Sequence, residues 1–172
     1  LFVDSDNFLD ENYIEKLYQK LCLEKADIAY SDLYDPDRHK IYLKSHPFDL
    51  SSFLERSYID SCSLVRTEVA QGVVYDVELN YKKLEDYDFL LNLIINKQAV
   101  PIYVQDTKLN YRVLENSISQ RNSTKYHFDV YLYVLKKYLD KIPKEVYQAL
   151  SDNIFTLEGR LDDLIQHTAK VA

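Results

Sequence analysis

The chain has 172 residues, 47% of them hydrophobic and 28% charged, and its net charge at pH 7 is -7. This composition predicts a folded domain with a sizeable core and excludes a disordered chain. The acidic balance argues against a nucleic-acid partner, because binding to phosphates requires clustered cations. No apolar run approaches the roughly 18 residues of a membrane-spanning helix. The two cysteines lack a close pair spacing, which argues against a disulfide framework or a zinc site and favours a reducing cytoplasm.

The amino end is predicted to be a strand followed by a helix. Residues 1–3, Leu-Phe-Val, are typical of the end of a buried strand that runs into a polar loop. Asp10 is the expected N-cap of a helix that extends to about residue 23. The predicted apolar stripe of this helix consists of Ile14, Leu17, Tyr18 and Leu21.

The middle of the chain is predicted to mix strands and helices with short connections, which indicates an α/β layer structure. A strand over residues 26–33 and a short antiparallel strand over 41–43 are separated by a turn in which Asp35 and Asp37 are solvated. The other expected elements are helices over 48–56 and 85–96, a strand over 61–66 leading into a helical turn, and strands over 100–104 and 108–112.

Residues 123–172 are predicted to form a separate helical tail. Its first helix has an apolar stripe of Phe128, Tyr131, Leu132, Leu135 and Leu139. Beyond Pro143, residues 147–168 show heptad spacing of apolar side chains, typical of a coiled-coil seam. This seam either packs on its own domain or joins two copies in a homodimer.

The start of the sequence indicates a piece of a longer protein. The chain contains no methionine and opens on Leu1, and a bulky residue in that position is not normally exposed by removal of a starting methionine. We therefore expect a partial domain over residues 1–122, followed by the tail.

Asp4 and Asp6 form an Asp-x-Asp pattern after the predicted first strand. Carboxyl ends of strands are where open α/β sheets place ligands, and two carboxylates there suit a hard divalent cation bridged to a diphosphate. The alternative is an acidic loop that caps the following helix. Asp-x-Asp is common in so acidic a chain, so the pattern alone does not decide.

Glu85 and Asp86 open the predicted helix over 85–96. Carboxylates at a helix amino end are favoured by capping and by the helix dipole, which is a sufficient structural explanation. The functional alternative is a general base that takes the proton of a sugar hydroxyl. Arg112, at the end of the last predicted strand, is either a surface residue or a partner for phosphate or carboxylate.

The order and spacing of several segments resemble the second half of a family 2 glycosyltransferase of the GT-A fold. The segments are Asp4-Ser5-Asp6-Asn7, Ser63-Leu64-Val65-Arg66, Gly72-Val73-Val74-Tyr75-Asp76, Glu85-Asp86-Tyr87-Asp88-Phe89, Leu109-Asn110-Tyr111-Arg112 and Asn116-Ser117-Ile118-Ser119. The resemblance covers roughly residues 1–119. Family members often carry a histidine shortly after the Tyr-Arg pair, whereas Leu114 and Glu115 follow here.

The resemblance implies an inverting, metal-dependent transfer from a nucleotide-diphosphate sugar to a hydroxyl of a saccharide or lipid-linked acceptor. It implies that Asp6 and Asp4 hold Mg²⁺ or Mn²⁺ and the donor, that Asp86 is the base with Glu85 beside it, and that Arg112 approaches the diphosphate. By analogy, the enzyme works in surface polysaccharide or glycoconjugate synthesis in the cytoplasm, peripherally at the inner face of the membrane. The nucleotide-binding half of such a domain does not precede Leu1, so we expect the isolated chain to be inactive.

A different class of function remains open from the sequence. In this alternative the chain is a non-catalytic interaction or oligomerisation module, its acidic motifs are structural, and the helical tail drives assembly.

Overall fold

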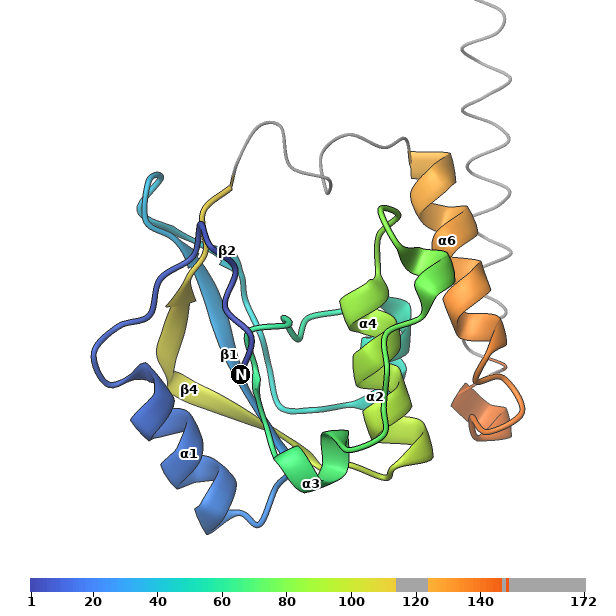
Figure 1. Ribbon diagram of the computed structural model, residues 1–172, viewed down its shortest axis with the longest axis horizontal. Coiled ribbons are helices and arrows are strands. Elements are labelled where there is room, and N and C mark those ends of the chain that lie inside the picture. The colour runs from blue at the N-terminus through green and yellow to red at the C-terminus, as the bar shows by residue number, and fades with distance from the viewer. Residues whose placement is uncertain (114–123, 147, 149–172) are drawn as a thin grey trace, which may run out of the picture. The chain divides into compact units, whose positions relative to one another are not determined.

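The computed structural model describes residues 1–113, 124–146 and 148. The chain divides into two compact units, residues 1–122 and 123–172. The first unit is a mixed α/β structure in which helices pack around a four-stranded mixed sheet (Figure 1). The predicted α/β class is confirmed.

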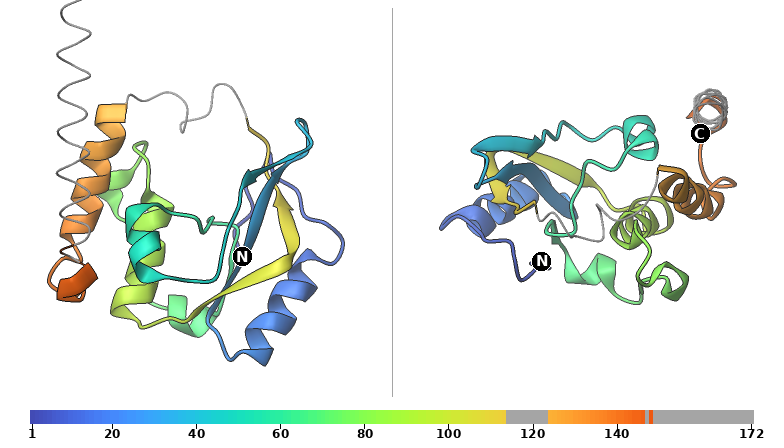
Figure 2. Two further views of the ribbon diagram at one scale, coloured as in Figure 1. Left: turned by 180° about the vertical axis from the view of Figure 1, so that it is seen from behind. Right: turned by 90° about the horizontal axis from the view of Figure 1, so that it is seen from above.

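The sheet is built around strand β1 (Ile28–Asp35), which is buried along nearly its whole length. Strands β2 (Lys40–Leu43) and β3 (Leu64–Val65) pair antiparallel with its carboxyl and amino halves, and β4 (Pro101–Asn110) pairs parallel along the other edge (Figure 2). Because β1 and β4 run parallel, both strands end at the same edge of the sheet. The antiparallel pairing predicted for residues 41–43 is confirmed.

Strand β4 is continuous, although two strands were predicted in its place. Tyr30 pairs with Tyr103 and Asp32 pairs with Lys108, so residues 104–107 of β4 form a bulge opposite a single residue of β1. The polar residues in this bulge interrupt the apolar pattern without ending the strand.

Helix α1 (Tyr13–Leu23) covers one face of the sheet. Tyr13, Leu17 and Leu21 recur at every fourth residue and are buried. Their neighbours in the core are Ala29, Leu33, Cys62, Val104 and Leu109. Each leucine buried in this way contributes about 1.5–3 kcal/mol. The prediction was wrong for Ile14 and Tyr18, which lie on the exposed side of the helix.

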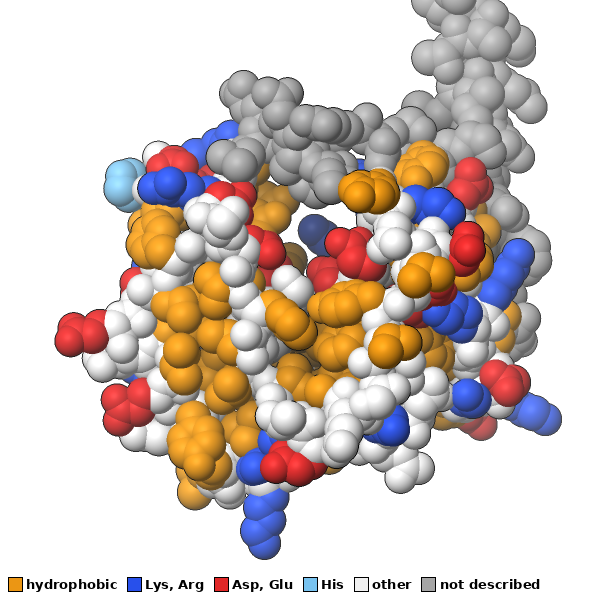
Figure 3. All heavy atoms as spheres, in the orientation of Figure 1, with side chains coloured by type: hydrophobic (Ala, Val, Ile, Leu, Met, Phe, Trp, Pro, Cys, Tyr) orange, Lys and Arg blue, Asp and Glu red, His pale blue; other side chains and the backbone are white. Residues whose placement is uncertain are grey.

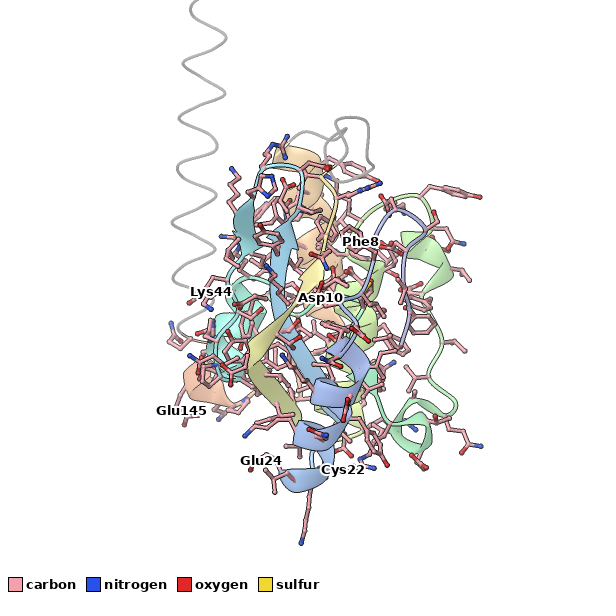
Figure 4. All side chains as sticks on the ribbon, turned by 90° about the vertical axis from the view of Figure 1, so that its left-hand side faces the viewer. Phe8, Asp10, Cys22, Glu24, Lys44 and Glu145 are labelled. Carbon is pink, nitrogen blue, oxygen red and sulfur yellow. The ribbon has the colours of Figure 1, made fainter. Side chains whose placement is uncertain are left out.

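Two predictions at the amino end are wrong. Residues 1–3 form no strand and are exposed, because none of the described strands runs beside them. Asp10 does not cap α1: its carboxylate accepts a hydrogen bond from the side-chain amide of Asn110 at 2.7 Å (Figure 4). Asn12 occupies the N-cap position and makes no side-chain capping bond.

The turn between β1 and β2 wraps around the Asp35 carboxylate, which is 0% exposed, so the prediction of a solvated Asp35 is wrong. Its carboxylate accepts hydrogen bonds from the backbone N–H groups of Asp37 (3.0 Å) and Arg38 (3.1 Å), and from the Arg38 guanidinium (2.9 Å). Burial opposes ionisation, but these hydrogen bonds outweigh it and hold the pKa of Asp35 below its ordinary value.

The remaining helices of the first unit pack beside the sheet as α2 (Leu50–Glu55), α3 (Thr67–Ala70) and α4 (Glu85–Leu91). A 3₁₀ turn spans Val77–Leu79, and α4 continues as a π-helical turn over Asn92–Asn96. The buried Tyr87 joins α4 to α2, because its hydroxyl donates to the carbonyl groups of Phe53 and Leu54 at 3.1 Å each. Helices predicted over 48–56 and 85–96 are confirmed.

In the second unit, helix α6 (Thr124–Lys136) confirms the first predicted helix of the tail. Its best-buried side chains include Val130 and Val134, which the predicted stripe omitted. The apolar residues of the predicted heptad seam lie outside the described residues. Within the described ranges, no helix is both long and apolar enough to cross a membrane.

Candidate functional site

The loop that carries Asp4 and Asp6 is tied to the end of strand β4. Phe8 and Asn110 exchange two backbone hydrogen bonds, N–H of Phe8 to the Asn110 carbonyl at 3.2 Å and the reverse at 3.3 Å. The loop therefore stands at the carboxyl end of β4, an edge where open α/β sheets bind ligands. It reaches that edge without being the continuation of a strand, contrary to the predicted local structure.

Arg112 follows β4 and lies beside the same loop. Its backbone N–H donates to the Asn7 side-chain oxygen at 3.1 Å, and its guanidinium carbon lies 5.8 Å from the centre of the Phe8 ring. The side chain is exposed. Leu114 and Glu115, where the sequence departs from the family pattern, lie outside the described residues.

Glu85 and Asp86 begin helix α4 after a strained residue. Leu84 has φ 65° and ψ 18°, a left-handed conformation that costs about 1–2 kcal/mol in a residue with a side chain. Glu85 is exposed, and Asp86 accepts a hydrogen bond from the backbone N–H of Tyr87 at 2.8 Å. The left-handed Leu84 therefore occupies the N-cap position of α4, directly before the two acidic residues.

Asp86 has the electrostatic character of a proton-transfer group. Burial, then the neighbouring charge of Glu85, raises its pKa to about 7, and the charge of Asp60 adds to the effect. A carboxyl group with a pKa near 7 exchanges its proton readily at neutral pH, which suits a general acid or base.

Asp60 is linked by its charge both to Asp4 in the amino-terminal loop and to Asp86. Burial raises its pKa, and the charge of Asp4 raises it further. Its carboxylate accepts a hydrogen bond from the Cys62 backbone N–H at 2.8 Å. Burial, followed by the charge of Asp60, raises the pKa of the Cys62 thiol to about 12, so Cys62 is not a nucleophile at neutral pH.

Two tyrosines border the same group of carboxylates. Burial raises the pKa of Tyr75, and the charges of Asp86, Glu85 and Asp4 raise it further. For Tyr111, burial comes first and then Tyr42, before the more distant charges of Asp60, Asp4 and Asp6, and the pKa rises to about 12. Acidic residues from three separate segments of the chain thus raise the pKa values of these two tyrosines.

We call this group the acidic cluster; it consists of Asp4, Asp6, Asp60, Glu85 and Asp86. Within it, burial raises the pKa of Asp4, and the charge of Asp6 adds to that effect. On the molecular surface, acidic side chains gather around a hollow (Figure 3). All five residues predicted for the site, Asp4, Asp6, Glu85, Asp86 and Arg112, belong to the cluster or to the strand end beside its loop.

Sequence reasoning missed Asp60 and Tyr75. Asp60 stands outside any Asp-x-Asp pattern, and its only signal was a polar residue between the apolar pair Tyr58-Ile59 and Cys62. Tyr75 is one of sixteen tyrosines, so its residue type carried no information. Only the fold brings these two residues to the cluster.

The carboxylates suit a cation that is shared with a phosphate ligand. In the described part of the chain, no three His, Cys, Asp or Glu side chains are arranged to hold a metal ion by themselves. Asp4 and Asp6 nevertheless place two mutually repelling carboxylates together. Mg²⁺ and similar hard cations are commonly bound by one or two carboxylates while phosphate oxygens and water complete the shell.

A separate pocket lies beside the amino end of α1 and the bulge of β4. Its lining residues include Tyr13, Lys16, Asp32, Ile41 and Asp106. None of the predicted site residues lines it, and the carboxylate of Asp32 is held by three hydrogen bonds.

No protein-family model matches the chain, and no curated protein gives a match. Functional inference therefore depends on the motifs of the sequence and on the geometry of the acidic cluster.

Proposed function

We propose that this chain is the acceptor-side half of a GT-A glycosyltransferase domain. The reaction is the inverting transfer of a sugar from a nucleotide-diphosphate sugar to an acceptor hydroxyl. The observation that carries the proposal is the convergence of the two motifs. The charges of Asp4, Glu85 and Asp86 all raise the pKa of Tyr75, although Asp4 is far from the other two in the sequence. Asp60 links the same segments, because Asp4 raises its pKa and it in turn raises the pKa of Asp86. The Phe2 and Phe89 rings, 6.3 Å apart, bring the two segments together.

The sheet supports the same assignment. Its parallel β1–β4 pair ends at one edge, and the loop of Asp4 and Asp6 is hydrogen-bonded to that edge through Phe8 and Asn110. A donor bound there would lie beside α4, whose first residues carry the proposed base. A transfer between two bound substrates requires binding sites this close together, because donor and acceptor must meet in a reactive orientation.

In the proposed reaction Asp86 is the general base. Its carboxylate accepts the proton of the acceptor hydroxyl while the oxygen forms a bond to the anomeric carbon of the donor. The bond from that carbon to the diphosphate oxygen breaks, and the nucleoside diphosphate leaves with the bonding electrons. Attack from the side opposite the diphosphate inverts the anomeric configuration. Glu85 raises the proton affinity of Asp86 and is available to contact acceptor hydroxyls.

The donor's diphosphate is negatively charged and the site is acidic, so a cation is needed between them. Asp6 and Asp4 are the residues that would hold Mg²⁺ or Mn²⁺, and the cation, when bound, neutralises charge on the leaving diphosphate. Arg112, beside the same loop, supplies a second positive charge near the diphosphate.

The test is a transferase assay on the enzyme that contains the complete GT-A domain, with a panel of nucleotide sugars. Asp86→Asn keeps the shape of the side chain but cannot accept the proton, and we expect a loss of about 10²–10⁴-fold in kcat. Asp37→Asn, which changes an exposed aspartate of the β1–β2 turn, is the matched control and should leave the rate unchanged. Near wild-type transfer by Asp86→Asn would refute the proposal.

A further inference from the structure

An aromatic wall stands beside the acidic cluster, formed by Phe2, Tyr75 and Phe89. The Tyr75 ring stacks on the Phe89 ring, with centroids 4.8 Å apart and an interplanar angle of 16°. Phe2 meets both rings edge-on, at 6.2 Å from Tyr75 and 6.3 Å from Phe89. The three residues come from the amino-terminal loop, the loop after α3, and helix α4.

One ring of the aromatic wall is buried, and the other two are exposed. Phe89 is buried, whereas Phe2 is 53% and Tyr75 is 37% exposed. Stacking on the buried ring fixes the orientation of Tyr75, because offset stacked aromatic pairs have a preferred geometry. Single exposed apolar residues need no explanation, but two adjoining exposed rings held in place by a third form a rigid apolar surface.

The wall lies beside the carboxylates, because Phe89 follows Asp86 by three residues and Glu85 by four on α4 and so shares their side of the helix. The Tyr75 phenol is close enough to Asp86, Glu85 and Asp4 for their charges to act on it. A ligand at this place therefore meets an aromatic surface on one side and carboxylate oxygens on the other. Small-molecule sites typically combine apolar and aromatic walls with a few polar groups that fix orientation.

A sugar ring matches this combination. A pyranose has C–H groups on its ring faces, which pack on aromatic surfaces, and hydroxyl groups around its rim, which donate hydrogen bonds to carboxylates. The ring near Asp86 belongs to the acceptor, because a general base must lie within hydrogen-bond reach of the hydroxyl that attacks. A phosphorylated lipid fits less well, since its phosphate group would lie beside Glu85 and Asp86, on the side away from the proposed cation, and their negative charges repel it.

We propose that the acceptor is a saccharide, and that Phe2 and Tyr75 bind the face of the sugar ring whose hydroxyl is presented to Asp86. This inference rests on the proposed transferase function and specifies its acceptor. Tyr75 and Phe2 are binding residues in this assignment; they take no part in proton transfer.

The experiment is an NMR titration of the 172-residue chain with a panel of neutral disaccharides, namely cellobiose, lactose and maltose. We expect at least one of them to shift resonances of Tyr75 and of the first residues of α4. Tyr75→Ala should weaken that binding by about tenfold, the scale of losing one aromatic contact. Tyr75→Phe keeps the ring and should retain binding within about threefold. Phe2→Ala should weaken it without any change in the fold around α4.

Tyr81→Ala is the matched control, since Tyr81 is 94% exposed and makes no part of the wall. It should bind like the wild type. Failure of every disaccharide to bind would overturn the inference, and so would binding that Tyr75→Ala and Phe2→Ala leave unchanged in folded protein. Tyr75-dependent binding of a polyprenyl phosphate in detergent, with no disaccharide bound, would also overturn it.

A parallel titration with Mn²⁺ and inorganic pyrophosphate separates this inference from the proposed function. If pyrophosphate binds in an Asp6-dependent manner but no saccharide binds, the proposed donor site is supported and only the saccharide acceptor is refuted. Saccharide binding without any Mn²⁺-dependent pyrophosphate binding supports the aromatic wall and counts against the transferase.

Discussion

Asp60 and Asp86 lie close enough for the charge of Asp60 to raise the pKa of Asp86, although they belong to different segments of the fold. Asp60 precedes β3 and is itself affected by Asp4, whereas Asp86 belongs to α4. Through this pair, charges in the amino-terminal loop and in the first turn of α4 influence one another. The pH dependence of stability and of activity should reveal this coupling.

The stability of the chain should fall as pH rises from about 4 to 7. The pKa of Asp86 is raised from 3.8 to about 7 by folding, so the folded state keeps a proton that the unfolded state loses in this window. Asp86→Asn has no proton to lose and should remove the contribution of Asp86 to this decline, which is at most about 4 kcal/mol at pH 8 relative to pH 4. Denaturant unfolding at several pH values measures the effect. A wild-type stability that rises across the window would contradict it, as would identical pH profiles for the two proteins.

Transfer activity should increase with pH through about 7, because Asp86 must be ionised to accept a proton. Glu85→Gln removes the neighbouring negative charge and should move the rising limb of kcat/KM to lower pH. Initial rates over a range of pH test this in the complete enzyme. A limb that stays in place after Glu85→Gln would show that Asp86 is not the titrating group.

Leu84 should be more tolerant of glycine than of alanine. Its φ of 65° lies in the left-handed region, where alanine is strained and glycine is not. Both substitutions delete the same side chain, so their difference isolates the backbone term. Leu84→Gly should be about 1 kcal/mol more stable to denaturant than Leu84→Ala. If alanine proves the more stable of the two, the strained turn before α4 is not present in solution.

The buried carboxylate of Asp32 should be important for stability and unimportant for chemistry. It accepts hydrogen bonds from the Lys44 ammonium at 2.5 Å, the Tyr103 hydroxyl at 2.8 Å and the Ser45 backbone N–H at 2.9 Å. Asp32→Ala leaves the buried Ser45 N–H and the Tyr103 hydroxyl without this acceptor and should lower the free energy of unfolding by about 2–3 kcal/mol. Lys44→Ala should have a much smaller effect, because the lysine is mostly exposed. Equal losses in the two variants would contradict the geometry.

The sequence predicted the class of the fold and most elements because their apolar periods are strong. Leu17 and Leu21 mark the buried face of α1, and the Glu85 segment has a clear helical period. The exposed positions of Ile14 and Tyr18 were not predicted, because the same period also fits the neighbouring face of the helix. The prediction that Asp35 is solvated was wrong. Residue types typical of a turn do not show whether the backbone N–H groups of that turn close around the side chain, as they do here.

The candidate site was predictable only as two separate motifs. Asp4 and Asp6, or Glu85 and Asp86, have adequate structural explanations when each pair is considered alone. Their proximity depends on long-range contacts, such as the Phe8–Asn110 pairing, that leave no local signal. Asp60 and Tyr75 join the site for the same reason and could not be found from spacing.

The heptad pattern of the tail remains a prediction about assembly. If residues 147–168 form an intermolecular seam, sedimentation should show a concentration-dependent dimer that disappears when the chain is truncated after Pro143. If the seam packs on its own domain, both versions should sediment as monomers.

The most direct test of the account is paramagnetic broadening of the chain's NMR signals by Mn²⁺ in the presence of inorganic pyrophosphate. A cation held by Asp4 and Asp6 should broaden the amide signals of the amino-terminal loop, of Asp60 and of the first residues of α4 together, and Asp6→Ala should abolish the effect. Broadening confined to the β1–β2 turn, or a loop that broadens while α4 stays sharp, would contradict a single site shared by the two acidic motifs.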